Sequence, residues 1–123
     1  MSKIAGSHLF LLRDFTPDDS SVIERLIKSL TDEIRVTRKG RHWEAYIRDQ
    51  EVGLTIHVYR TDEVLCDCED DLMEMDMLLE DAPECISILT NLGTENDLKA
   101  CEALTLLISE ELKCRTLGAN LHS

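Results

Sequence analysis

Apolar and polar side chains alternate with a period of two through residues 34–58, in three runs separated by turn-forming residues at 39–40 and 49–51. A period of two is typical of strands that bury one face. The pattern predicts three strands of an antiparallel meander, and a further alternating run at residues 64–68 predicts a fourth. The apolar positions of the first three runs are Ile34, Val36, Trp43, Ala45, Ile47, Val52, Leu54, Ile56 and Val58.

A helical period appears before the meander. Thr16 suits the N-cap of a helix, Pro17 suits its first position, and Asp19 stands near the acidic position of a capping box. The sequence predicts an amphipathic helix that ends near Thr31 or Asp32. Its apolar positions are Val22, Ile23, Leu26, Ile27 and Leu30.

The stretch from Asp71 to Asp81 fits two structures. Three methionines alternate with acids there, as in a strand, whereas Leu72, Met75 and Leu79 are spaced as in a helix. We expect a fifth strand, with a helix as the alternative.

Two helices are predicted for the C-terminal part. Residues 84–92 indicate a short helix closed by Gly93. Thr94 and Asp97 form a capping pattern that opens a longer helix over residues 95–113.

These elements, with a short strand over residues 8–14, predict one α+β domain over residues 1–123. Its antiparallel sheet is expected to have about four to six strands, packed with an N-terminal helix and two C-terminal helices. The ends, residues 1–6 and 119–123, are expected to be frayed.

The charge is concentrated in one block. The chain has 25 acidic and 13 basic residues, and residues 61–98 hold thirteen of the acids and no Lys, Arg or His. The remaining 12 acids and 13 bases nearly cancel, so almost all of the net charge of −12 belongs to this block. Such a balance disfavours contact with nucleic acid or an anionic membrane and favours a basic protein partner.

The block also contains methionine and leucine, which predicts a folded acidic surface with adaptable apolar anchors. A purely solubilising role is the alternative. The expected partner-binding residues are Asp67, Glu69, Asp70, Asp71, Glu74 and Asp76 for attraction, with Met73, Met75 and Tyr59 as anchors.

Cys66, Cys68 and His57 are the nearest approach to a metal signal. Zinc sites more typically pair cysteines two residues apart with a second matching pair, which is missing from this sequence. We therefore predict no metal, no cofactor and no catalytic residues, and we expect the cysteines to be small hydrophobic residues of a cytoplasmic protein. No stretch is apolar enough to span a membrane.

A basic hairpin contrasts with the acidic block. Arg35, Arg38, Lys39 and Arg41 surround its turn, with Trp43 and Tyr46 nearby. Such a cluster can hold single-stranded nucleic acid. It can also pair with the acidic block of the same chain or of a second copy.

In size and composition the chain resembles bacterial immunity proteins, which neutralise a toxin by covering its basic cleft. It is also similar to the acidic chaperones of secretion effectors, although those usually begin with a helix. The leading prediction is an immunity-type inhibitor, not an enzyme, that covers a basic site on a toxin or nuclease. A dimeric chaperone or adaptor that associates through residues 95–113 is the first alternative, and a metal-dependent enzyme or redox protein at Cys66, Cys68 and His57 is the second.

Overall fold

The computed structural model describes residues 6–64, 70, 73–74 and 78–114. Within these residues the chain forms five strands, two helices and two short 3-10 turns. In chain order they are β1 (Gly6–Leu11), α1 (Pro17–Lys28), β2 (Arg35–Lys39), β3 (His42–Ile47), β4 (Val52–Arg60), η1 (Thr61–Val64), η2 (Leu79–Asp81), β5 (Glu84–Thr90) and α3 (Glu95–Leu112).

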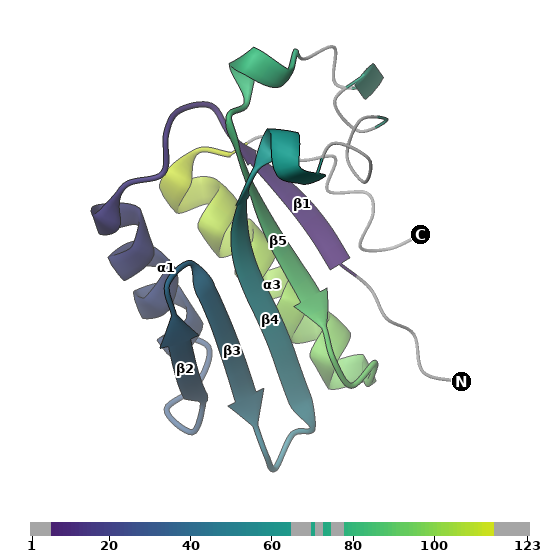
Figure 1. Cartoon of the computed structure of the whole chain (residues 1–123). Coiled ribbons are helices and arrows are strands. Elements are labelled where there is room, and N and C mark those ends of the chain that lie inside the picture. The colour runs from purple at the N-terminus through teal and green to yellow at the C-terminus, as the bar shows by residue number, and fades with distance from the viewer. Residues whose placement is uncertain (1–5, 65–69, 71–72, 75–77, 115–123) are drawn as a thin grey trace.

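The strands form one antiparallel sheet in the order β1-β5-β4-β3-β2 (Figure 1). The predicted meander is confirmed for β2, β3 and β4, which are neighbours in both sequence and space. The last strand, β5, returns beside β4, and β1 pairs with its other side. The α+β class and the strand number agree with the prediction.

Both helices cover the same face of the sheet, α3 behind the central strands and α1 near β2 (Figure 1). The core between the layers is mainly aliphatic, with Trp43 as its largest side chain. One polar contact crosses the layers: Ser7 of β1 and Thr105 of α3 are joined by a buried hydrogen bond of 2.9 Å.

The ends of α1 follow from its capping residues. The Thr16 side chain accepts a hydrogen bond from the Asp19 N–H, and the Asp19 carboxylate accepts one from the Thr16 N–H, so the predicted capping box is confirmed. The helix stops at Lys28, with Ser29 as its C-cap, a few residues before the expected end. The Ser29 hydroxyl donates to the Leu26 carbonyl and closes the last turn.

The prediction of two C-terminal helices is wrong. The expected helix at residues 84–92 is the strand β5, and α3 is the one helix that follows it in the described part of the chain. This strand lies between β1 and β4, and both of its faces are buried: Ile86 faces the helices, whereas Cys85 pairs with the buried Phe10 on the opposite face. Two-sided burial removes the alternation by which a strand is recognised.

The strand expected over residues 71–81 is also wrong in its described part. Asp70, Met73 and Glu74 are helical, and Leu79–Asp81 form the turn η2. Val64, where a fourth alternating run was expected, belongs to η1. Cys66 and Cys68 lie outside the described residues, as do most residues of the two expected frayed ends, although Gly6 begins β1.

Candidate functional site

The ends of two central strands bring the described parts of the acidic block together. Arg60, the last residue of β4, is paired with Glu84, the first residue of β5. The turns η1 and η2, which adjoin these residues, therefore lie at the same end of the sheet (Figure 1). The Thr61 N–H donates to the Pro83 carbonyl at 3.0 Å and fixes one turn against the other.

An open depression of about 560 Å³ lies between these turns. Its lining combines apolar and charged side chains, and we call it the η1–η2 surface: Arg60, Asp62, Leu78, Glu80 and Pro83. Leu78 is 62% exposed and shares the lining of the depression with Asp62 and Glu80. Its backbone is held in place, because the Leu78 N–H donates to the Asp81 carboxylate and the Asp81 N–H donates to the Leu78 carbonyl.

The structure describes four of the nine predicted partner-binding residues. Met73 is 71% exposed, and Asp70 and Glu74 are exposed as well. Tyr59 lies half-buried on β4, on the sheet face opposite the helices, where its ring lies against the ring of His57 at 4.1 Å between centroids. The other five lie outside the described residues: Asp67, Glu69, Asp71, Asp76 and Met75.

Two acids of the block are buried in the interior and therefore do not contribute to an acidic surface. Glu84 is 1% exposed and Asp97 is fully buried. The Asp97 carboxylate accepts hydrogen bonds from the backbone N–H groups of Gly53, Leu92 and Gly93, and so joins the start of β4 to the turn before α3. The acids of the block that the structure places at the surface are Asp62, Glu63, Asp70, Glu74, Glu80, Asp81 and Glu95.

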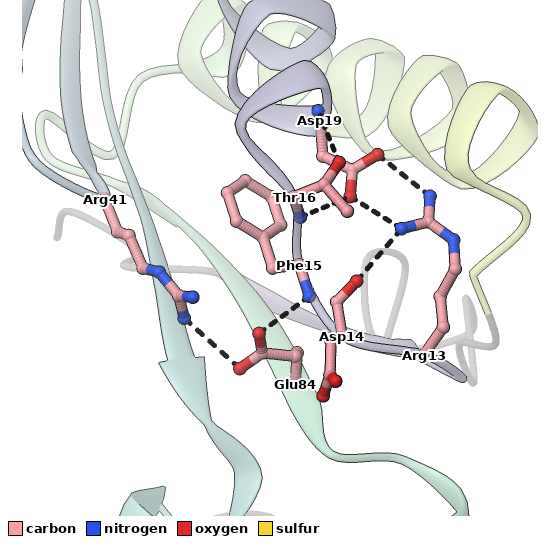
Figure 2. A network of polar contacts seen from close by, with 7 residues as sticks. All are labelled: Arg13, Asp14, Phe15, Thr16, Asp19, Arg41 and Glu84. Carbon is pink, nitrogen blue, oxygen red and sulfur yellow. Dashed lines mark hydrogen bonds and ion pairs between the residues drawn. The ribbon is translucent and has the colours of Figure 1, made fainter.

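Glu84 connects three segments that are distant in sequence (Figure 2). One carboxylate oxygen accepts a hydrogen bond of 2.8 Å from the Phe15 N–H, and the other forms an ion pair of 3.2 Å with Arg41. The guanidinium of Arg41 also lies over the Phe15 ring, at 5.2 Å from its centroid. The basic hairpin therefore pairs with the acidic block of its own chain at this point.

The aromatic residues of the hairpin do not form a stacking platform for bases. Trp43 is fully buried in the core, and Arg38 lies over its ring at 5.2 Å. Tyr46 is 45% exposed on the opposite face of the sheet. Because stacking on exposed aromatic faces supplies much of the affinity for single strands, this arrangement weakens the nucleic-acid alternative.

A cross-strand histidine pair is a feature that the sequence reasoning missed. His42 of β3 and His57 of β4 are register partners, and their Nδ1 atoms are 3.0 Å apart. Burial lowers the pKa of His57, and the nearby His42 and Arg41 lower it further, against an opposing effect of Glu63. From the sequence, His57 is grouped with Cys66 and Cys68 and is not paired with His42; the register of the hairpin is the signal that pairs the two histidines.

The remaining alternatives are a dimer interface on α3 and a metal site. The apolar stripe of α3, expected as a dimer interface within residues 95–113, packs into the core through Cys101, Leu104, Ile108 and Leu112, which leaves Leu106 as its exposed large hydrophobic residue. Among the described residues, no three His, Cys, Asp or Glu side chains converge as a metal site. No helix in the described part of the chain is long and apolar enough to cross a membrane.

Comparison of the chain with protein-family models, with curated proteins and with solved structures gave no match.

Proposed function

We propose that the protein is a binding module for a basic protein, and that the η1–η2 surface is its docking site. The observation that carries the proposal is the exposure of Leu78 over an open depression whose rim holds Asp62 and Glu80. An exposed apolar side chain inside a charged rim is the usual composition of an interface centre.

The charges around the depression favour a cationic partner. Among the residues that the structure describes, the exposed acids Asp62, Glu63, Asp70, Glu74, Glu80 and Asp81 outnumber Arg60, the one base in the described lining of the depression. Acids in this number raise the local concentration of a basic partner and speed its association, more than they strengthen the final complex. Most of the affinity would then come from apolar anchors, Leu78 and Met73.

The biological role that we infer is that of an immunity-type inhibitor, which covers a basic site on a toxin or nuclease. The burial of the α3 stripe disfavours the dimeric chaperone, which would need that stripe at a subunit interface. The burial of Glu84 and Asp97 removes these two acids from the candidate docking residues.

The test begins with capture of partners from native lysate, followed by association kinetics with the purified partner at low and high salt. The variant Asp62→Lys/Glu80→Lys should slow association about tenfold or more at low salt and less at high salt. Leu78→Ala should mainly speed dissociation, because apolar anchors act after docking.

A matched control carries the same change of charge elsewhere. Glu95→Lys/Glu102→Lys places two reversed charges on the exposed side of α3 and should slow association far less. The partner's own activity must fall when the complex forms. Salt-independent association, or equal slowing by both double variants, would remove the η1–η2 surface from the proposal.

A further inference from the structure

Three histidines lie in one row across the sheet face that the helices leave open. In register, His42 of β3 pairs with His57 of β4, His57 pairs with Ser87 of β5, and Ser87 pairs with His8 of β1. His42 and His57 are in direct contact, with 5.2 Å between ring centroids and 3.0 Å between Nδ1 atoms. His8 is one strand further away.

The surroundings of His42 favour an Nδ1 atom that carries no proton and accepts the hydrogen bond from His57. Its other nitrogen, Nε2, lies 3.5 Å from the Glu44 carboxylate, which favours the tautomer with the proton on Nε2. A carboxylate beside the outer nitrogen is the arrangement that commonly orients a metal-binding histidine.

His57 contributes the second imidazole. A neutral imidazole is the form that binds metal ions. The charges nearby nearly balance: Arg41 and Lys39, the register partner of His42, oppose Glu44 and Glu63. The ring of Tyr59 lies against the ring of His57, with 4.1 Å between centroids.

The two nitrogens are close enough to bind one ion together. Metal–imidazole bonds of about 2.0 to 2.1 Å from both Nδ1 atoms would enclose an angle of about 95° at the metal. This angle is close to the right angle between neighbouring ligands of tetragonal copper(II) or nickel(II), and it is smaller than the tetrahedral angle that zinc prefers.

We propose that His42 and His57 form a two-imidazole site for copper(II) or nickel(II), with water in the remaining positions. In the metal-free pair, one Nδ1–H donates to the other Nδ1. When the ion binds, that proton moves to Nε2 of the same ring, and both Nδ1 lone pairs turn to the metal. No electron is transferred and, where both rings are neutral, no proton is released. The site does not depend on the proposed docking function.

Titration of the full-length protein with nickel(II), followed by calorimetry near pH 7.5, tests the site without reduction of the ion by the thiols. One strong equivalent is expected for the wild type. His42→Gln and His57→Gln should each weaken binding at least about tenfold, because one of two chelating ligands is lost. His8→Gln, the matched control from the same row, should bind as the wild type does.

A second readout identifies the ligands. Electron spin-echo spectra of the copper(II) complex should show two imidazole nitrogens in the wild type and one in His57→Gln. Circular dichroism confirms that each variant is folded. Unchanged nickel affinity in both pair variants, or a copper spectrum with no paired imidazoles, would overturn the site and leave the contact as an N–H···N hydrogen bond.

Discussion

Glu84 and Arg41 form an ion pair of 3.2 Å in which the carboxylate is almost fully buried and the guanidinium is 42% exposed. The pair joins the first residue of β5 to the residue that precedes β3. Glu84 also holds the Phe15 N–H, so its carboxylate fixes the connection between β1 and α1 (Figure 2).

Replacement of Glu84 should therefore destabilise the fold in two distinguishable steps. Glu84→Gln keeps an acceptor for the Phe15 N–H and loses the ion pair, which should cost about 1 to 2 kcal/mol. Glu84→Ala also leaves the Phe15 N–H without a partner and should cost about 3 kcal/mol or more. Urea unfolding measures both, with the exposed Glu102→Gln as a control expected to change stability by less than about 0.5 kcal/mol.

Asp19 should make stability depend on acid pH. Its pKa lies below the ordinary value of 3.8, mainly because Arg13 donates two hydrogen bonds to the carboxylate, at 2.6 and 2.8 Å. Burial acts in the opposite direction, and the Thr16 backbone and side chain lower the pKa further.

A carboxyl with a lowered folded-state pKa stabilises the protein at pH values above its unfolded-state pKa, because between the two pKa values the unfolded state binds more protons and stability rises with pH. That contribution is lost as the pH falls below 3.8 and through the folded-state pKa. The wild type should lose more stability than Asp19→Asn between about pH 5 and pH 3 in urea titrations. Parallel curves for the two proteins would contradict the assignment.

The thiols of Cys101 and Cys114 should resist alkylation in the folded protein. Burial raises the pKa of Cys101 to about 11 and that of Cys114 to about 12, so almost no thiolate exists at neutral pH. Because the thiolate is the nucleophile, iodoacetamide should modify these residues only after unfolding. Peptide mass spectrometry after timed labelling, in native buffer and in urea, measures the difference.

Glu51 offers a stabilising substitution. Its φ of 54° places a side chain with a Cβ in the left-handed region, where glycine meets no steric cost. Its side chain is exposed, and its carbonyl accepts from the Thr94 hydroxyl whatever the side chain is. Glu51→Gly should raise the unfolding free energy by about 0.5 to 1 kcal/mol. Asp49→Gly, outside the left-handed region in the same turn, should lower it.

The sequence was informative about the fold wherever structure is local. The strands of the meander are joined by short turns, and each buries one face, so their alternation survives in the sequence. The same reasoning failed at β5, where Cys85 and Ile86 are both buried on opposite faces. Cys85 lies between its register partners Phe10 and Tyr59, and pairing between residues so distant in sequence has no local signal.

The candidate sites show the same difference between features that local sequence predicts and features that depend on distant contacts. His42 and His57 alternate with the apolar positions of their strands, and the register of one hairpin is enough to make them neighbours. By contrast, no local feature separates Glu84 from the other acids of its block, and the capping pattern of Asp97 does not predict its burial. Only the folded structure shows that backbone N–H groups of distant segments bring these two into the interior.

The pairing of β1 with β5 has a consequence for synthesis of the chain. Leu11 finds its partner Glu84 only after α1, β2, β3 and β4 have been made. A nascent chain on the ribosome therefore carries an apolar first strand, Leu9 to Leu11, with no neighbour to complete it. Because a strand that waits for a distant partner is exposed to aggregation, chaperone dependence during translation should be greater than the protein's small size suggests.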